Sequence, residues 1–246
     1  MCEHYVARAS EPFALGELWD FTRLLERYGL AGWSWGVAWI DADGAIAAHR
    51  DPRPFHADEA VERLATTETT AALVHLRRPS KLSTVGIADT QPFVDPAGRF
   101  AFSHNGDLRD HRALRRRYQA EGRIAGRADS EVGQRWLEDR WVDGIDAMND
   151  LAAMHDTFGG QANLLALGQD GAAHAYAGNT ENPVFTFRLG RIGLASTGIY
   201  SLDRSLFRFV APRATVRRVV RPGQGVTLDR TGAPAAPARA LAVATS

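Results

Sequence analysis

A chain of 246 residues, 45% of them hydrophobic, can bury one substantial core, and this length does not require a second domain. The 29 basic and 29 acidic residues cancel, which argues against nucleic acid or an anionic membrane as a partner selected by charge. A single cysteine excludes an internal disulfide, no apolar run reaches the roughly 20 residues that cross a bilayer, and the N-terminal segment lacks a signal-peptide pattern. We therefore expect a cytoplasmic protein.

The first half of the chain predicts strands around one helix, because alternating apolar residues are typical of strands and apolar residues three or four apart are typical of helices. The expected elements are a strand at 3–10, a helix at 15–29, a hairpin at 34–50, and strands at 71–78 and 99–106. The hairpin turns at Asp43-Gly44, a dipeptide that favours tight turns.

The second half predicts three helices followed mostly by strands. The helices are expected at 109–122, 129–141 and 144–158, and the strands at 161–178 (a second Asp-Gly hairpin), 183–196, 215–220 and 223–229. Antiparallel hairpins around central helices indicate an α+β fold in which two stacked sheets carry helices outside. We expect one domain over residues 1–231 and a flexible Ala/Pro-rich tail over residues 232–246.

Several common chemistries are not supported by the motifs. The sequence GWSWG at residues 32–36 fits a nucleophile elbow, but a helix is expected before it and a strand after it, so Ser34 is interpreted as a strand residue. No phosphate-binding loop occurs, and the eight histidines lack zinc-ligand spacing, so neither a metal nor a cofactor is expected. The arginines of RALRRRYQ are interpreted as a solvated helical surface.

The single cysteine stands directly after the initiator methionine. If Met1 is removed, Cys2 carries a thiol and a free α-amine on the same residue. The thiol needs a base to become a nucleophile, and an α-amine of pKa about 7.7 to 8.0 is suited to that task. Two alternatives are a chance buried cysteine on the first strand and a Cys-His pair with His4, which lies on the same face of a regular strand.

Five short motifs occur in an order that decides between these interpretations. The series MCEHYV, HLRRPS, DTQPF, FSHNGDL and ADSE resembles the class II glutamine amidotransferases, in particular their stand-alone bacterial members. The resemblance extends from Met1 to the strand GQGVTL, and HNG together with the N-terminal cysteine is its most specific part. It implies the four-layer αββα sandwich of N-terminal-nucleophile hydrolases.

The resemblance implies that Cys2 attacks the γ-carboxamide of glutamine and forms a γ-glutamyl thioester, which water then hydrolyses to glutamate. It places Asn105 and Gly106 in the oxyanion hole, where a side-chain N–H and a backbone N–H face the developing negative charge. The residues alone leave open a plain Asn-Gly turn after a strand at this position.

The resemblance also implies three residues that bind the substrate head group. Arg77 matches the residue that holds the α-carboxylate, Ser80 stands where the family has a threonine beside that carboxylate, and Asp129 matches the partner of the α-ammonium. On sequence grounds alone, Arg77 could instead form a surface ion pair, and Asp129 could cap the helix that it begins.

Some positions depart from the family pattern. Arg78 and Pro79 replace apolar or small residues, and TQPF replaces the more usual THPF. No synthase domain follows the glutaminase region in this sequence, so three hypotheses stay open: a free-standing γ-glutamyl amide hydrolase, a glutaminase subunit that delivers ammonia to a separate synthetase, and a non-catalytic glutamine-binding protein. Cholylglycine hydrolases also use an N-terminal cysteine, but Arg77 with Asp129 argues against a substrate without an amino-acid head group.

Overall fold

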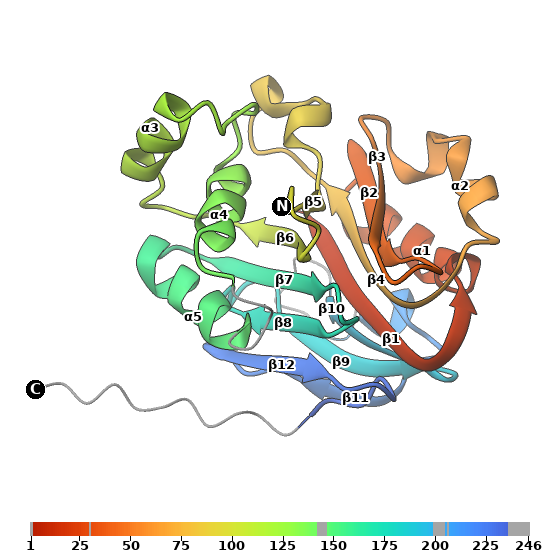
Figure 1. Ribbon diagram of the computed structural model, residues 1–246. Coiled ribbons are helices and arrows are strands. Elements are labelled where there is room, and N and C mark those ends of the chain that lie inside the picture. Colours follow the sequence, from red (N-terminus) through yellow and green to blue (C-terminus); the bar gives the residue numbers. More distant parts are fainter. Residues whose placement is uncertain (1, 30, 142–146, 199–204, 206, 236–246) are drawn as a thin grey trace, which may run out of the picture.

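The fold is taken from a computed structural model, which describes residues 2–29, 31–141, 147–198, 205 and 207–235. Within these residues the strands form two antiparallel sheets (Figure 1). The first sheet has the spatial order β11 (Thr215–Val219), β9 (Val184–Leu189), β10 (Ile192–Thr197), β1 (Glu3–Ala14), β4 (Glu68–Arg77), β2 (Ser34–Ile40) and β3 (Ile46–Asp51). The second has the order β12 (Gln224–Leu228), β8 (Ala173–Ala177), β7 (Ala162–Gly168), β6 (Phe100–Gly106) and β5 (Phe93–Val94).

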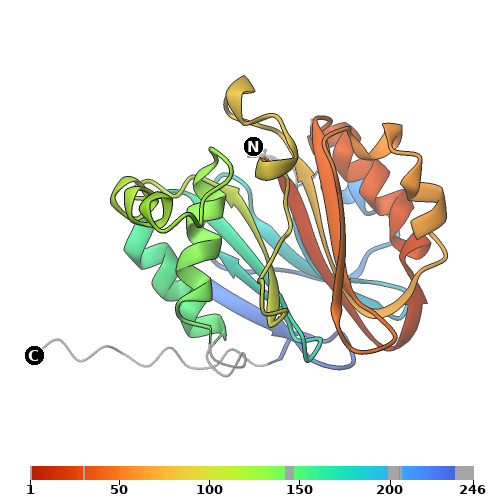
Figure 2. The ribbon, with the colours of Figure 1, turned by 45° about the horizontal axis from the view of Figure 1, so that its top comes forward.

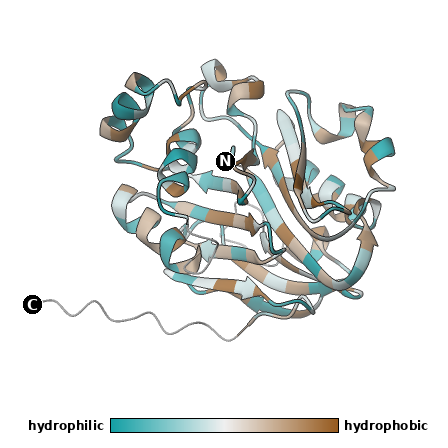
Figure 3. Cartoon of the chain, in the orientation of Figure 1, coloured by the Kyte–Doolittle hydropathy of each residue, from teal (hydrophilic) through white to brown (hydrophobic). Residues whose placement is uncertain are grey.

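Helices cover the outer faces of both sheets, which gives the predicted four-layer αββα arrangement (Figure 2). The helices beside the first sheet are α1 (Trp19–Gly29), α2 (Ala60–Leu64) and α6 (Phe207–Val210); those beside the second are α3 (Arg112–Ala120), α4 (Asp129–Glu138) and α5 (Ala147–Phe158). Hydrophobic residues are frequent in the strands, whereas α3 is mostly hydrophilic (Figure 3). Its surface character agrees with the interpretation of the arginine-rich sequence.

Three hydrophobic clusters hold these layers together. One lies between the first sheet and its helices, a second between the other sheet and its helices, and a third between the two sheets. The alternation of side chains along a strand assigns them, since Tyr5 of β1 packs on the helices and Val6 faces the second sheet. By the same alternation, Cys2 and His4 face the second sheet from the start of β1.

The structure confirms the strands, hairpins and helices expected in the described residues, with differences at their ends and one further division: residues 183–196 form two strands, β9 and β10, joined by a turn at Gly190. Strand β1 extends to Ala14 and its register shifts between Arg8 and Phe13, while the helix at 15–29 begins with a 3₁₀ turn, Leu15–Leu18. Ser34 lies buried in β2, as expected for a strand residue. The short elements α2, α6 and β5 were not predicted, because two to five residues are too few to display a hydrophobic period.

The C-terminal segment follows β12 for a few residues. The Ala235 N–H donates to the Thr227 carbonyl at 2.8 Å, and Pro234 bridges to Leu228. The remaining residues of the predicted tail, 236–246, lie outside the described residues. In the part of the chain that the structure describes, no helix is long and apolar enough to span a membrane.

Candidate active site

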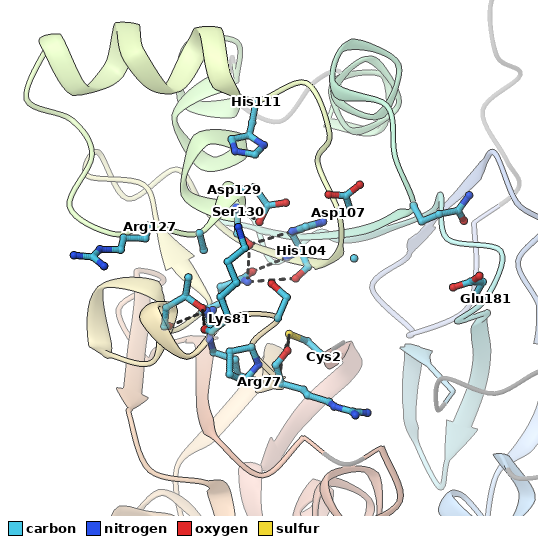
Figure 4. Close-up of a pocket in the computed structure, with 18 residues that line it drawn as sticks. Cys2, Arg77, Lys81, His104, Asp107, His111, Arg127, Asp129, Ser130 and Glu181 are labelled. Carbon is cyan, nitrogen blue, oxygen red and sulfur yellow. Dashed lines mark hydrogen bonds between the residues drawn. The ribbon is translucent and has the colours of Figure 1, made fainter.

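A cavity of about 460 Å³ opens where the start of β1 and the end of β4 meet the end of β6 and the start of α4 (Figure 4). Five of the six residues that the sequence predicted for the site line this cavity: Cys2, Arg77, Ser80, Gly106 and Asp129. They come from segments far apart in the chain, and the antiparallel pairing of β1 with β4 brings the first two together. The sixth residue, Asn105, does not line the cavity.

Cys2 lies directly before β1 and turns its thiol toward the end of β4. The Arg78 backbone N–H donates to Cys2 Sγ at 3.4 Å. Burial raises the pKa of the Cys2 thiol, while the positive charge of Arg77 and the Arg78 N–H act in the opposite direction. Because burial is the largest of these effects, the thiol needs a nearby base before it can act as a nucleophile.

His4 does not provide that base in this arrangement. Its Nδ1 lies 2.9 Å from Ser103 Oγ on β6, and the residue is fully buried between the sheets. Burial, and next to it the charge of His104, holds the pKa of His4 well below its usual value, so the ring stays neutral. The structure therefore places His4 as an inter-sheet residue and not as a partner of the Cys2 thiol.

Asn105 points from β6 toward the nucleophile's own backbone. Ala101, on the same face of β6, lies in the cluster between the two sheets, so the alternation of the strand turns Asn105 toward the first sheet. Its Nδ2 donates to the Cys2 carbonyl. An amide nitrogen carries two hydrogens, so one N–H is left after this bond. The residue predicted for the oxyanion hole therefore also ties the second sheet to Cys2.

Gly106, the last residue of β6, occupies a position that strongly favours glycine. Its φ is +127°, which side chains rarely adopt, and a Cβ atom would lie 1.7 Å from the Gln161 carbonyl oxygen. The Ala162 N–H, opposite Gly106 on β7, is directed at the Gly178 carbonyl and therefore not at β6. In such a pair the N–H groups of both residues point outward, so the Gly106 N–H faces away from β7.

Arg77 is a buried residue with a fixed guanidinium. Only 4% of it is exposed, and it forms no ion pair with any described residue, which rules out the surface ion pair. Its Nη2 donates to the Thr84 carbonyl at 2.9 Å and its Nη1 to the Asp89 carbonyl. These carbonyls follow Ser80 in the loop between β4 and β5, where Ser80 itself is exposed at the cavity.

Asp129 is the first residue of α4 and not its N-cap, which is Ala128. Its Oδ2 accepts a hydrogen bond of 2.8 Å from the Leu108 N–H, and its Oδ1 accepts one of 3.0 Å from the Ser130 N–H. A carboxylate is stabilised at a helix N-terminus by the helix dipole. Asp129 thus joins α4 to the segment after β6, while its oxygens retain further acceptor positions toward the cavity.

Three buried polar residues of the cavity wall that had no role assigned from the sequence bond to one another: Gln91, His104 and Ser130. The Gln91 carboxamide contacts the His104 backbone and Ser130 Oγ, and His104 Nδ1 lies 3.0 Å from Ser130 Oγ. All three belong to motifs quoted above, DTQPF, FSHNGDL and ADSE. The motifs gave their positions, but no sequence signal indicates that these side chains bond to one another.

A separate group of possible metal ligands, His49, Asp51 and Asp58, brings its ligand atoms within 4.8 Å of one another. It does not line the cavity. His49 Nε2 lies 2.7 Å from Asp58 Oδ2, and the Arg53 guanidinium pairs with Asp51 at 2.9 Å and Asp58 at 3.2 Å. One arginine therefore already pairs with both carboxylates of this group.

The fold and the cavity together define a class of protein. Two antiparallel sheets between helical layers, with a cysteine at the start of the first strand and at the mouth of a cavity, form the architecture of N-terminal-nucleophile hydrolases. Within that class the chain belongs to the class II glutamine amidotransferases, whose family model matches residues 1–180. Such proteins act on the amide of glutamine. No curated protein matched the chain.

Solved structures support the same fold. A glutamine phosphoribosylpyrophosphate amidotransferase from B. subtilis, complexed with ADP and GMP, aligns with a TM-score of 0.70 and 17% identity over 93% of this chain and 47% of its own. A second structure, described as the allosteric regulatory enzyme of purine biosynthesis, aligns with a TM-score of 0.68 and 16% identity, over 93% of this chain and 47% of its own. A glutamine aminotransferase class-II domain protein from Silicibacter pomeroyi aligns with a TM-score of 0.58 and 20% identity, over 96% of this chain and 99% of its own. The chain thus spans about half the length of the first two proteins.

Proposed function

We propose that this protein hydrolyses the γ-amide of glutamine or of a γ-glutamyl compound through a γ-glutamyl thioester on Cys2. The observation that carries the proposal is the convergence of Cys2, Arg77, Gly106 and Asp129 on one cavity. These residues supply a nucleophile, an oxyanion donor and two opposite charges, which is the set that an amide with an amino-acid head group requires.

The reaction begins at the thiol, with the α-amine of Cys2 as the base once Met1 has been removed. Met1 itself lies outside the described residues. The amine takes the thiol proton, the sulfur attacks the γ-carbonyl carbon, and the carbonyl oxygen becomes negative. Collapse of this intermediate breaks the C–N bond, and the leaving amine takes the proton from the α-ammonium. Water then attacks the thioester, which releases glutamate and regenerates the thiol.

Two N–H groups are proposed to stabilise the negative oxygen. Gly106 offers a backbone N–H that points away from β7, and Asn105 offers the Nδ2 hydrogen that is not bonded to the Cys2 carbonyl. Both donors belong to the end of β6. Donors that are held in place before the reaction need no reorganisation when the charge develops, and this makes them effective.

The head group is proposed to lie between Arg77 and Asp129. Each terminal nitrogen of a guanidinium carries two hydrogens, so the bonds of Arg77 to the Thr84 and Asp89 carbonyls fix its plane and leave N–H groups for the α-carboxylate. The α-ammonium would pair with Asp129. The cavity of about 460 Å³ lies within the size range of sites for ligands larger than glutamine, which favours a γ-glutamyl compound.

A second candidate function is a glutaminase subunit that passes ammonia to a separate synthetase. It is favoured by exposed apolar side chains in the loop after Ser80, where Leu82 is 75% exposed, Ile87 49% and Val85 43%. Apolar residues gathered on a loop beside a cavity are typical of a protein contact. A non-catalytic glutamine-binding protein is the third and weakest candidate.

The test is a screen of the purified protein against glutamine and a panel of γ-glutamyl amides, with Cys2→Ala as the control. Rapid turnover of one bulky amide would support the hydrolase, whereas weak glutaminase activity on every compound would support a missing synthetase partner. No Cys2-dependent hydrolysis of any compound would contradict both and leave the non-catalytic candidate.

A further inference from the structure

The side chain of Gln91 pairs with the backbone of β6 in place of a neighbouring strand. Its Oε1 accepts a hydrogen bond of 2.6 Å from the His104 N–H, and its Nε2 donates to the His104 carbonyl at 3.3 Å. The same Nε2 donates to Ser130 Oγ at 3.1 Å, at the start of α4. Gln91 is only 1% exposed, so these bonds are formed in a buried setting.

This pairing is needed because the neighbouring strand is too short. Strand β5 has two residues and pairs only with Ala101 and Phe102 of β6. Beyond Phe102, no strand among the described residues pairs with the edge of β6 that faces away from β7, so the buried His104 N–H and carbonyl need other partners. The carboxamide of Gln91 supplies one acceptor and one donor, as a strand residue would.

The next outward-facing N–H on this edge is that of Gly106, the proposed oxyanion donor. Successive N–H groups of a strand alternate in direction, so the N–H groups of His104 and Gly106 point to the same side. The Gln91 carboxamide, which holds His104, therefore also orients the Gly106 N–H two residues later. Through Ser130 the same carboxamide reaches the neighbour of Asp129, the proposed partner of the α-ammonium.

The chain before Gln91 is anchored to the first sheet. Arg50 on β3 donates to the Thr90 carbonyl at 2.9 Å, and Thr90 Oγ1 donates to Ser34 Oγ on β2 at 3.2 Å. Gly36 leaves room for the passing chain, since a Cβ there would lie 2.5 Å from the Gln91 carbonyl oxygen. Gln91 therefore connects the sheet that carries Cys2 with the strand end that carries the oxyanion donors.

We propose that Gln91 is a positioning residue for amide hydrolysis, which holds the Asn105-Gly106 end of β6 in register with Cys2. This inference rests on the proposed function. A displaced oxyanion donor weakens an interaction that forms only in the transition state, so kcat should fall while KM changes little. A misplacement of about 1 Å can reduce a rate by about 100-fold.

The experiment compares Gln91→Met with Gln134→Met, on the best substrate of the wild-type protein. Gln134 is a glutamine of α4, equally 1% exposed, whose Nε2 donates to Glu138 and which does not line the cavity. Both variants remove buried hydrogen bonds, so both should lower the free energy of unfolding. Only Gln91→Met should lower kcat, by about 10- to 100-fold with KM within about threefold. Equal kcat in the two variants, or a change confined to KM, would overturn the proposal.

Two further measurements keep the test decisive if Gln91→Met folds poorly. Gln91→Glu has the same shape and keeps the acceptor for the His104 N–H, but loses the donor to the His104 carbonyl and Ser130, so kcat should still fall at least about fivefold. Alkylation of Cys2 by iodoacetamide needs no oxyanion hole and should proceed at the wild-type rate in folded variants. Slower alkylation in parallel with kcat would show a damaged nucleophile and overturn the proposal. An inactive wild-type protein would refute the proposed function instead.

Discussion

The side-chain amide of Asn105 donates a hydrogen bond to the backbone carbonyl of Cys2, which joins the end of β6 in one sheet to the start of β1 in the other. The residue proposed to stabilise the oxyanion therefore also orients the residue that carries the nucleophile. The two contributions can be separated by experiment, because only one of them acts on the transition state.

Replacement of Asn105 by alanine should lower kcat by about 10²- to 10³-fold, the usual effect of removing one oxyanion donor, with little change in KM. Asn163→Ala is the matched control. Asn163 is buried directly opposite Asn105 on β7 and donates to the Asn182 carbonyl at 2.7 Å, whereas Asn105 donates to the Cys2 carbonyl. The Asn163→Ala variant should lose stability and keep kcat. A drop of Asn105→Ala confined to KM would make Asn105 a binding or turn residue.

Gly106→Ala should be more destabilising than alanine at an open glycine of positive φ. Gly98 has φ +73°, and no atom lies within 4 Å of the place that an added Cβ would take, so Gly98→Ala should cost only about 1 to 2 kcal/mol of backbone strain. At Gly106 the Cβ would also meet the Gln161 carbonyl, and the backbone must move. Urea unfolding of both variants measures the difference, and equal losses would show that the contact relaxes without cost.

The active protein should lack Met1. While Met1 is attached, the Cys2 nitrogen is an amide and cannot act as the base, and the methionine fills the space beside the thiol. Intact mass spectrometry combined with activity measurements tests this expectation. A species that retains Met1 should be inactive, and cleavage of that methionine should restore turnover. Full activity with Met1 in place would exclude the α-amine mechanism.

The site should recognise both charged groups of the substrate head group, the α-carboxylate and the α-ammonium. Loss of one partner from a hydrogen-bonded charge pair costs on the order of 2 to 5 kcal/mol, so glutaramide and N-acetylglutamine should not be turned over. Arg77→Lys keeps the charge but loses the planar fork, and should still weaken binding substantially, as should Asp129→Asn.

The surface pair Arg23 and Asp20, 3.1 Å apart, provides matched controls for these substitutions. Arg23→Lys and Asp20→Asn should leave kcat/KM unchanged. Comparable kcat/KM values for glutamine and glutaramide would refute the assignment of Arg77 and Asp129 and would favour an amidase of the cholylglycine-hydrolase type.

The stability of the protein should fall steeply in mild acid. Burial lowers the pKa of His4, His75 and His104 in the folded protein, whereas an unfolded histidine titrates near 6.5. The unfolded state therefore binds more protons below about pH 6.5, and the free energy of unfolding decreases as the pH falls through that value. Each histidine adds at most about 1.4 kcal/mol per pH unit. Denaturant unfolding between pH 8 and 5 should show a smaller slope for His75→Gln; an unchanged slope would contradict this account.

Local patterns in the sequence determined the elements and the order of the site motifs. Asp-Gly pairs gave the turns of two hairpins, and the alternation of residues 3–10 gave β1, because these signals act between residues only a few positions apart. The position of Cys2 directly after Met1 and the Asn-Gly pair at the end of a strand could also be recognised from the sequence alone. Of the six site residues that the family resemblance implied, five line one cavity.

Only the tertiary structure decided how those residues meet. Asn105 contacts the Cys2 backbone, Arg77 is held by loop carbonyls, and Asp129 binds the Leu108 N–H, all across distances in the chain that no periodic pattern reports. Gln91 is the clearest case, because its partner on β6 follows from the shortness of β5, and a strand of two residues has no period to detect. Which side chain completes a buried edge depends on what packs beside it, and that is a property of the assembled layers.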